Sequence, residues 1–337
     1  MDSAHLLALT EAFRGRRVVI IGDVVADEFV YGRVARVSRE APVLILEYDS
    51  TEIVPGGAGN AANNVAALGG AAALVAVVGR DDPGRRVVAA LHRRVDPKCL
   101  VRANGQPTPI KTRILAGGVH SAKQQVVRID RAVPRSLDAA TRKAIERSVL
   151  RAVQRADAVL VSDYGSGVVT PALVRKMAAE LRRQGHPIPI LIDSRYRLLD
   201  YTGVTISTPN QSEVEQALGA RIGDNLRTLE RAGRELLERT RTQAVLITRG
   251  SRGMALFQRA APTVHIPISG SESIVDVTGA GDTVVSTVAL ALAAGGSFEA
   301  AARLANFAGG LVVMKRGTAT VSADELWDVI SGSDSDA

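Results

Sequence analysis

The stretch Val275-Asp276-Val277-Thr278-Gly279-Ala280-Gly281-Asp282-Thr283 decides how the chain is interpreted. Three small residues at 279–281 come just before an apolar run at residues 283–292, which is long enough for a buried helix. A helix that begins at a glycine turn leaves backbone N–H groups unpaired at the positive end of its dipole. Because no bulky side chain covers these groups, an anion can approach them closely. The stretch therefore predicts an anion-binding helix N-terminus.

Asp282 is unexpected in a simple phosphate cradle, because its carboxylate would repel the phosphate. A general base would have a reason to lie there: it would take the proton from an attacking hydroxyl while the N–H groups stabilise a transferred phosphoryl group. The alternative is that Asp282 only caps the helix and that the glycines only make a turn. Short glycine motifs often match by chance, so the rest of the chain has to decide between the two.

Composition limits the possible functions. The chain has 337 residues, 46% of them hydrophobic, which is enough for a large α/β core. Its net charge of +7 comes mostly from arginines dispersed through expected helices, so we expect an anionic small-molecule substrate and no nucleic acid. The single cysteine, Cys99, excludes an intrachain disulfide. No apolar run reaches the ~18 residues that span a membrane, and the first ten residues do not resemble a signal peptide, so we expect a cytoplasmic protein.

A buried parallel strand is predicted for Arg17-Val18-Val19-Ile20-Ile21-Gly22-Asp23, because the run is apolar throughout and rich in β-branched residues. Asp23 and Asp27 follow at the carboxyl edge of this strand, where open α/β sheets bind their ligands. Each of the two could equally be an aspartate that caps a turn.

Two parts of the chain, at about residues 30–54 and 110–130, have short β segments and no helical period. We interpret these segments, at residues 31–34, 43–47, 52–54, 110–116 and 125–130, as a small sheet that projects from the main domain and forms a lid over a cleft. A lid that excludes water suits phosphoryl transfer to a sugar, because water is a competing acceptor.

A second glycine loop, Pro55-Gly56-Gly57-Ala58-Gly59-Asn60-Ala61-Ala62-Asn63-Asn64, enters an Ala-rich helix. Its asparagines can donate hydrogen bonds to hydroxyls and accept them. The glycines alone would also allow a dinucleotide site, but they lack G-x-G-x-x-G spacing, and no acidic residue ends a strand about 20 residues later. One strand at residues 73–79 is expected after this helix.

From residue 137 onward, helix and strand patterns alternate, and the predicted strands at 158–163, 188–192, 205–207 and 244–248 end in polar residues. Repeated βα units predict one doubly wound, mostly parallel sheet with its site along one edge. We therefore expect a single α/β domain over residues 1–330, followed by a frayed acidic tail over residues 331–337.

Together, the two glycine motifs resemble the signatures of the ribokinase-like (pfkB) carbohydrate kinases, in the family's order. The first, Gly56-Gly57-Ala58-Gly59-Asn60-Ala61-Ala62, fits throughout; the second, at residues 276–282, departs only at the later Thr287, where the family usually has Ala or Gly. The resemblance runs from about residue 18 to 322. It is greatest to heptose-7-phosphate 1-kinases, which make precursors of ADP-heptose, in the segments 22–27, 37–43, 162–164, 208–213 and 317–321.

The resemblance implies a role for each matching residue, with ATP and Mg²⁺ as cofactors. Asp282 matches the catalytic base, and Gly279, Ala280 and Gly281 match its anion hole. Asn210 and Glu213 match an N-x-x-E element that organises magnesium through water, although alone they would also fit a helix cap. The further matches are Thr248, Gly250, Asn306 and Gly309 for the nucleotide, Asp27, Gly57 and Asn60 for sugar hydroxyls, and Asp276 and Thr278 for a monovalent cation such as K⁺.

Two lysines expected in heptose kinases are absent. After the Ser-Asp-Tyr segment the chain continues Gly165-Ser166-Gly167 in place of Ala-Lys-Gly, and Asp193-Ser194-Arg195 replaces Asp-Pro-Lys. Arg195 could supply one missing positive charge, but with a different geometry. As hypothetical anchors for a substrate phosphate we name Arg113 and Arg128, together with Lys111, although each would also fit an ordinary solvated strand position.

These patterns lead us to expect an ATP- and Mg²⁺-dependent kinase that phosphorylates D-glycero-D-manno-heptose 7-phosphate at its anomeric hydroxyl. The alternatives are a pfkB kinase for another sugar or sugar phosphate of the fructose or ribose type, a non-catalytic sugar or nucleotide sensor, and an NAD-binding dehydrogenase. Bifunctional relatives continue into a nucleotidyltransferase where this sequence stops, so we expect a kinase only. The lid strands are expected to pair two copies into a homodimer.

Overall fold

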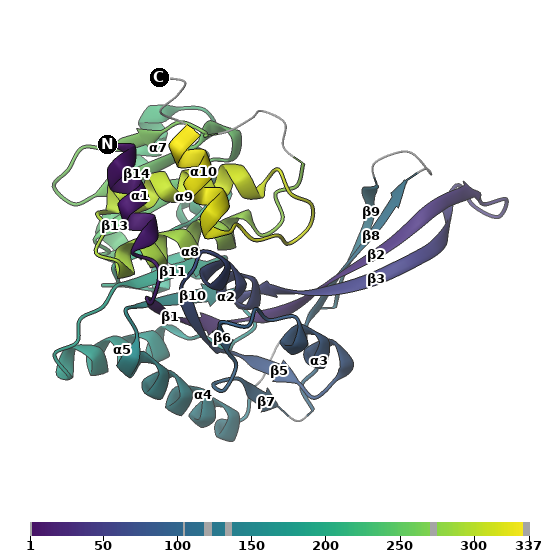
Figure 1. Ribbon diagram of the computed structural model, residues 1–337, viewed down its shortest axis with the longest axis horizontal. Helices are drawn as coiled ribbons and strands as arrows, with labels where there is room; N and C mark the ends of the chain where they lie inside the picture. Colours follow the sequence, from purple (N-terminus) through teal and green to yellow (C-terminus); the bar gives the residue numbers. More distant parts are fainter. Residues whose placement is uncertain (1, 104, 118–122, 132–136, 270–274, 333–337) are drawn as a thin grey trace.

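The computed structural model describes residues 2–103, 105–117, 123–131, 137–269 and 275–332. Its main body contains a nine-stranded sheet with the order β15-β14-β13-β12-β11-β10-β1-β4-β6 (Figure 1). Strand β1 (Arg17–Gly22) is parallel to both of its neighbours, β10 (Ala158–Asp163) and β4 (Ala71–Val75). The remaining strands are β6 (Val95–Asp96), β11 (Ile190–Ser194), β12 (Ile206–Ser207), β13 (Ala244–Thr248), β14 (Met254–Gln258) and β15 (Val264–Ile266). Among the described strands of this sheet, only the pairs β13–β14 and β14–β15 are antiparallel, so the expected mostly parallel sheet is confirmed.

Helices cover both faces of this sheet, which explains why its strands are continuous apolar runs. Val18 and Ile20 of β1 belong to one hydrophobic core, while Val19 and Ile21 belong to another on the opposite face. The first face is covered by α1 (Ser3–Glu11), α2 (Ala58–Ala67), α8 (Ala280–Ala293), α9 (Phe298–Val312) and α10 (Ala323–Gly332). The other is covered by α4 (Ala139–Ala152), α5 (Pro171–Arg183), α6 (Gln211–Leu218) and α7 (Leu226–Thr240).

The C-terminal end of the chain differs from the expected boundary at residue 331. Helix α10 runs through Gly332, so the first two residues of the expected tail are helical. The rest of that tail lies outside the described residues. Within the described part of the chain, no helix combines the length and the apolar character that crossing a membrane requires.

Residues 73–79 form two strands, and the expectation of one was wrong. β4 ends at Val75, and β5 (Val77–Gly79) pairs with β7 (Val101–Ala103) in a separate two-stranded sheet. Helix α3 (Asp82–Ala89) follows. After β4 the chain leaves the large sheet at its carboxyl edge, and β5 pairs with β7. An uninterrupted apolar run in the sequence does not reveal that the second half pairs with a different strand.

A four-stranded sheet projects from the main body (Figure 1). Its order is β3-β2-β8-β9, from β2 (Val24–Val37), β3 (Leu44–Gly57), β8 (Ile110–Gly117) and β9 (Gln124–Arg131). The three short segments expected in residues 30–54 are two long strands, with shifts of register after Tyr31 and after Val34. Such irregularities bend and twist a strand without ending it, so in the sequence they looked like turns.

Candidate active site

Helix α8 begins at Gly279, which has a left-handed φ of 77°. A side chain here would meet the amide of Asn60, because a Cβ on Gly279 would lie 2.5 Å from Asn60 Nδ2. The backbone N–H of Ala280 donates to the Val277 carbonyl at 3.2 Å. This N–H group, one of those expected to bind an anion, therefore already has a partner within the turn. The first turn of α8 therefore forms as expected, with a position that only glycine fits well.

Asp282 lies in this first turn with its side chain almost completely buried, at 3% residue exposure. Its Oδ2 accepts a hydrogen bond of 2.8 Å from Asn60 Nδ2, and its Oδ1 accepts one of 3.2 Å from the Tyr164 hydroxyl. Burial raises the pKa of Asp282 to about 7, although both hydrogen bonds favour the charged form. The carboxylate is thus poised to exchange a proton near neutral pH.

A polar cavity of about 520 Å³ opens in front of Asp282. Its walls come from the ends of parallel strands, from the projecting sheet and from the first turns of α6 and α8. The lining residues that concern us are Asp27, Gly57, Lys111, Arg113, Arg128, Tyr164, Asp193, Arg195, Asn210, Glu213, Thr278, Gly279 and Asp282. Four of the five predicted substrate residues therefore share one cavity. Asn60, the fifth, is 1% exposed and contacts the cavity through Asp282.

A second, mostly apolar cavity of about 390 Å³ lies on the other side of the first turn of α8. It brings together all four predicted nucleotide residues, Thr248, Gly250, Asn306 and Gly309, from the end of β13 and from α9. The same cavity is lined by Ala280 and Gly281, and it shares Asn210 and Val277 with the polar cavity. The two cavities thus meet at the N-terminus of α8.

Asn210 and Glu213 cap helix α6 and also line the polar cavity. The Asn210 side chain accepts from Glu213 N, and the Glu213 side chain accepts from Asn210 N, each at 2.9 Å. The capping and ligand-binding interpretations are therefore compatible. Across the residues that the structure describes, no group of three or more His, Cys, Asp and Glu could hold a metal ion. A hard cation here would fit only as Mg²⁺ commonly binds, through one or two protein oxygens, water and phosphates.

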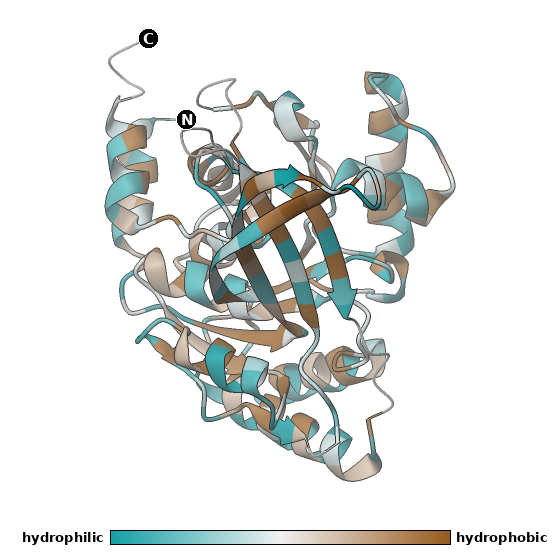
Figure 2. Cartoon of the chain, turned by 90° about the vertical axis from the view of Figure 1, so that its right-hand side faces the viewer, coloured by the Kyte–Doolittle hydropathy of each residue, from teal (hydrophilic) through white to brown (hydrophobic). Residues whose placement is uncertain are grey.

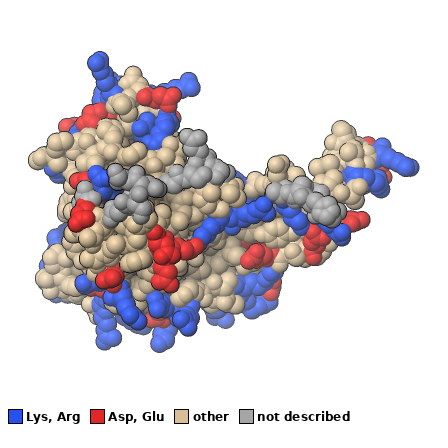
Figure 3. All heavy atoms as spheres, turned by 45° about the horizontal axis from the view of Figure 1, so that its top comes forward, with Lys and Arg blue, Asp and Glu red and all other residues tan. Residues whose placement is uncertain are grey.

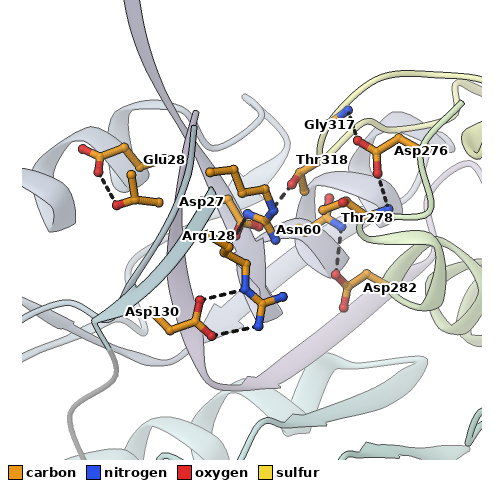
Figure 4. A network of polar contacts seen from close by, with 12 residues as sticks. Asp27, Glu28, Asn60, Arg128, Asp130, Asp276, Thr278, Asp282, Gly317 and Thr318 are labelled. Atoms are coloured by element: carbon orange, nitrogen blue, oxygen red, sulfur yellow. Dashed lines mark hydrogen bonds and ion pairs between the residues drawn. The ribbon is translucent and has the colours of Figure 1, made fainter. Parts of the chain in front are cut away.

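Asp276 is held by two backbone N–H groups from different loops (Figure 4). Its Oδ1 accepts from Thr278 N at 2.9 Å, and its Oδ2 accepts from Gly317 N at 3.0 Å. Each carboxylate oxygen keeps a second lone pair for a cation. The donor set is thus compatible with the monovalent cation that the resemblance implies.

Arg113 forms a buried ion pair with Asp27. Its NH1 lies 2.6 Å from Asp27 Oδ1, and the two side chains are only 10% and 9% exposed. Asp27 Oδ2 also accepts from the Thr318 hydroxyl at 3.1 Å (Figure 4). Arg128, by contrast, lies at the cavity rim on the exposed strand β9, paired with Asp130 at 2.9 Å. Of the two arginines named as phosphate anchors, the one with an accessible guanidinium is Arg128.

A third cavity, of about 370 Å³, extends outward from the polar one. Both are lined by Lys111, Arg128, Tyr164 and Arg195, and the third adds Ser166. Ser166 and Arg195 stand where the resemblance to heptose kinases leads us to expect lysines, and both line this third cavity. Lys111 Nζ lies 5.0 Å from the centre of the Tyr164 ring, and burial lowers the pKa of this lysine.

Sequence reasoning missed two contributors to this site. Tyr164, quoted only as part of a resembling segment, contacts Asp282 directly and lines two cavities. Asp193 lines the polar cavity, and burial holds the pKa of its carboxyl well above the usual range. Both residues lie at or just after the ends of predicted strands, a position that could have marked them as candidates.

Comparison with known proteins also indicates a carbohydrate kinase. A family model described as pfkB family carbohydrate kinase matches residues 16–325. The bifunctional protein HldE of Caulobacter sp. strain K31 is 42% identical over 334 residues, 98% of this chain and 66% of that protein. The HldE protein of Geobacter sulfurreducens is 40% identical, over 91% of this chain and 61% of its own length. The chain thus spans about two thirds of the length of these curated relatives.

Solved structures confirm the fold. Phosphofructokinase-2 from Escherichia coli in complex with fructose-6-phosphate has a TM-score of 0.74 at 18% identity, covering 94% of this chain and 99% of that chain. Ribokinase from Arabidopsis thaliana, complexed with ribose and ATP, has a TM-score of 0.69 at 20% identity with the same coverage. The expected carbohydrate kinase is therefore confirmed, and the dehydrogenase alternative is not. By its sequence, its fold and the match over residues 16–325, this chain belongs to the pfkB family of carbohydrate kinases.

Proposed function

We propose that this sugar kinase transfers the γ-phosphoryl group of ATP to the anomeric hydroxyl of D-glycero-D-manno-heptose 7-phosphate, which gives the 1,7-bisphosphate and ADP. The observation that carries the proposal is the meeting of two cavities at the first turn of α8. The polar cavity contains Asp282, and the apolar one is lined by Ala280 and Gly281. A hydroxyl in the first and a nucleotide in the second would meet at this turn.

Asp282 is the proposed general base. It takes the proton from the acceptor hydroxyl as that oxygen bonds to the γ-phosphorus and the bond to the bridging oxygen of ADP breaks. Asn60 and Tyr164 hold the carboxylate with one hydrogen bond to each oxygen. The backbone of Gly279, Ala280 and Gly281 directs the positive end of α8 toward the transferred group, which favours the charge that develops there.

The apolar cavity is the proposed nucleotide site. Thr248 and Gly250 line it from the end of β13 and the turn that follows, Asn306 and Gly309 line it from α9, and its apolar lining suits a base. Asn210 and Glu213 lie at the junction with the polar cavity, where they would hold Mg²⁺ through water. The ion, when bound, neutralises charge on the phosphates. Asp276 and Thr278 are the proposed contacts for K⁺; a solved structure of E. coli phosphofructokinase-2 is titled as a complex with potassium.

The phosphate of the substrate is assigned to the outer cavity, where Lys111, Arg128 and Arg195 converge. Three cationic side chains around one cavity favour a dianionic group, and an arginine can bind phosphate oxygens bidentately. Ser166 adds a hydroxyl. Arg113 has a different task in this proposal: its ion pair fixes Asp27, which with Gly57 is placed to contact sugar hydroxyls.

The heptose phosphate is favoured by the similarity to HldE proteins at 37–42% identity. A second candidate is another sugar phosphate, such as one of the fructose type. What favours it is the pair of departures at Ser166 and Arg195, which lie in the outer cavity that would recognise the phosphate. Both candidates need the same base and the same nucleotide site, so they differ only in the acceptor.

The proposed partner is a second copy of the chain, joined through the projecting sheet. Hydrophobic residues recur along its strands (Figure 2). Among its exposed residues are Tyr48, Val127 and Ile129, which are 67%, 48% and 48% exposed. Val127 and Ile129 alternate with Arg128 along β9 and so point away from the cavity. No nucleic-acid partner is proposed, because on the face in view Lys and Arg are spread over several elements with Asp and Glu between them (Figure 3).

Analysis of the product by ³¹P NMR tests the proposed reaction. With ATP, Mg²⁺ and heptose 7-phosphate, we expect a new phosphate ester on the anomeric carbon while the original ester remains. A new ester on another carbon would overturn the proposed acceptor hydroxyl. Turnover of a different sugar phosphate and none of the heptose compound would favour the second candidate.

A further inference from the structure

Four buried side chains link helices α2 and α8 in one chain of hydrogen bonds. Thr283 Oγ1 donates to Asn64 Oδ1 at 2.9 Å, Asn64 Nδ2 donates to Asn60 Oδ1 at 3.0 Å, and Asn60 Nδ2 donates to Asp282 Oδ2 at 2.8 Å. Exposure is 0% for Thr283 and Asn64, 1% for Asn60 and 3% for Asp282. Since Asp282 and Thr283 are neighbours in sequence, the chain of bonds begins and ends on the same turn of α8.

This chain of bonds has a single direction. An amide side chain has a donor end and an acceptor end, and a deprotonated carboxylate can only accept. Asn64 Nδ2 also donates to the Asn60 main-chain carbonyl at 3.0 Å, and because a carbonyl only accepts, Asn64 turns its nitrogen to Asn60 and its oxygen to the Thr283 hydroxyl, which holds it there. Asn60 must then present its oxygen to Asn64 and its nitrogen to Asp282. If Asn60 turned over, two oxygens would face each other in a buried site, which is costly.

We propose that Asn64 and Thr283 are positioning residues for phosphoryl transfer, which act by fixing the side-chain amide of Asn60 with its NH₂ group toward the Asp282 carboxylate. This inference rests on the proposed role of Asp282 as the base. Neither residue lines either cavity that meets at α8. The Thr283 hydroxyl has one further, longer contact, to the Gly279 carbonyl at 3.4 Å. In this inference the two residues act through Asn60, and their effect on the reaction is an effect on the charge state of the base.

Other titratable and charged groups around Asp282 also influence its pKa. The Tyr164 hydroxyl and the Lys111 ammonium favour its charged form, while Asp27 opposes it. Asp193, on β11, is a further carboxyl whose charge interacts with it. Asp163, Glu213, Arg113, Arg128 and Arg195 line the same cavity. None of these groups contacts the Asn64 and Thr283 side chains in a described hydrogen bond, so a change at Thr283 leaves them in place.

Replacement of Thr283 by valine tests the inference, because valine keeps the shape and removes the hydroxyl. Asn64 then loses the donor to its oxygen and holds Asn60 less firmly, so we expect the pKa of Asp282 to rise and the acid limb of kcat/KM against pH to move up by about 0.5–1 pH unit. Activity would then fall about three- to ten-fold near pH 6 and recover by about pH 9. Thr283→Ser should restore the wild-type profile, and Asn64→Leu should reproduce the effect of valine.

Ser286→Ala is the matched control. The Ser286 hydroxyl donates to the Ala61 carbonyl at 3.0 Å, so this variant removes a buried hydrogen bond between the same two helices, outside the chain that ends on Asp282. Its pH profile should match the wild type. A loss in Thr283→Val that is equal at every pH, or a profile that Ser286→Ala shifts as much, would overturn the inference.

The inference can also be tested separately from the proposed function. The wild-type protein is assayed first; if it turns over no acceptor, the proposed function has failed. The titration of the Asp282 carboxyl can then be followed directly by ¹³C NMR, with Asp282→Asn to assign the signal. An upward shift in Thr283→Val that Thr283→Ser reverses supports the positioning role without any turnover, and an unchanged titration contradicts it.

Discussion

The side-chain nitrogen of Asn60 lies 2.8 Å from Oδ2 of Asp282, although 222 positions separate the two residues in the chain. Asn60 belongs to the first glycine motif and Asp282 to the second. The contact arises because α2 and α8 pack together on one face of the large sheet, through small side chains such as Ala61 and Ala62. Two short motifs that are weak signals separately thus build one site, with the first motif holding the carboxylate of the second.

The first prediction concerns the pH dependence of activity. Because the pKa of Asp282 is about 7, its carboxylate becomes protonated as pH falls through this value and can no longer accept a proton. We expect kcat/KM to decline about ten-fold per pH unit below about pH 7. A profile measured with saturating ATP and Mg²⁺ checks this. An activity that stays flat down to pH 5 would show that another group, or no group, accepts the proton.

A second prediction concerns stability. The pKa of Asp282 is raised above its unfolded value of 3.8, so between about pH 4 and pH 7 the native state binds more protons than the unfolded state. This group therefore makes the protein less stable as pH rises through that window. Asp282→Asn cannot become charged, and we expect it to increase the free energy of unfolding by about 1–3 kcal/mol at pH 8.

The comparison of the same two proteins at pH 5 is the control for this stability effect. Wild-type Asp282 is mostly protonated there, so the advantage of the asparagine should shrink. Urea unfolding at both pH values gives the difference. An asparagine variant that is less stable than the wild type at pH 8 would contradict the account of a buried charge at this position.

Much of the site was predictable from sequence because of one geometric fact: parallel strands end at the same edge. Asp27, Asn210 and Thr248 each follow or end a predicted strand, and the structure brings them to two adjoining cavities. The apolar runs of β1, β10 and β13 also marked the sheet, because both of its faces are covered.

The parts that sequence reasoning missed depend on partners distant in the chain. Arg113 looked like a solvated strand residue or a phosphate anchor, and only the register of β2 with β8 reveals its pairing with Asp27. The role of Asn64 follows from Thr283, which no local pattern connects to it. Thr287 departs from the family pattern, yet it fits because its hydroxyl donates to the Thr283 carbonyl one turn back, at 2.8 Å.

Arg195 provides a prediction about the substrate phosphate. Arg195→Ala should raise the KM for the sugar phosphate about ten- to a hundred-fold, since it removes a charged hydrogen-bond donor, with the KM for ATP nearly unchanged. Arg197→Ala is the control, because this neighbouring arginine pairs with Asp200 at 3.2 Å and lines neither of the two cavities that Arg195 shares with Lys111. If both variants bind the sugar phosphate like the wild type, the phosphate lies elsewhere.

Because the projecting sheet has exposed hydrophobic residues, we predict that the protein is a homodimer. We expect a solution mass of twice the 35.5 kDa of one chain, measured by light scattering. The double variant Val127→Asp and Ile129→Asp, on the face opposite Arg128, should return a single-chain mass, because it places charges in a buried apolar contact. Ala139→Asp and Ala140→Asp, at exposed positions in the first turn of α4, add the same two charges and serve as the control. A wild-type mass near 35.5 kDa would reject the dimer.

The most direct measurement is ADP release by the wild type and by Asp282→Asn, with ATP, Mg²⁺ and a panel of heptose 7-phosphate, fructose 1- and 6-phosphates, ribose and fructose. We predict turnover confined to the heptose phosphate in the wild type. In the variant we predict a loss of about 10²–10⁴-fold with ATP binding retained. Wild-type activity in the variant, or tight ATP binding by the wild type with no turnover of any acceptor, would contradict the assignment of Asp282 as the base of a sugar-phosphate kinase.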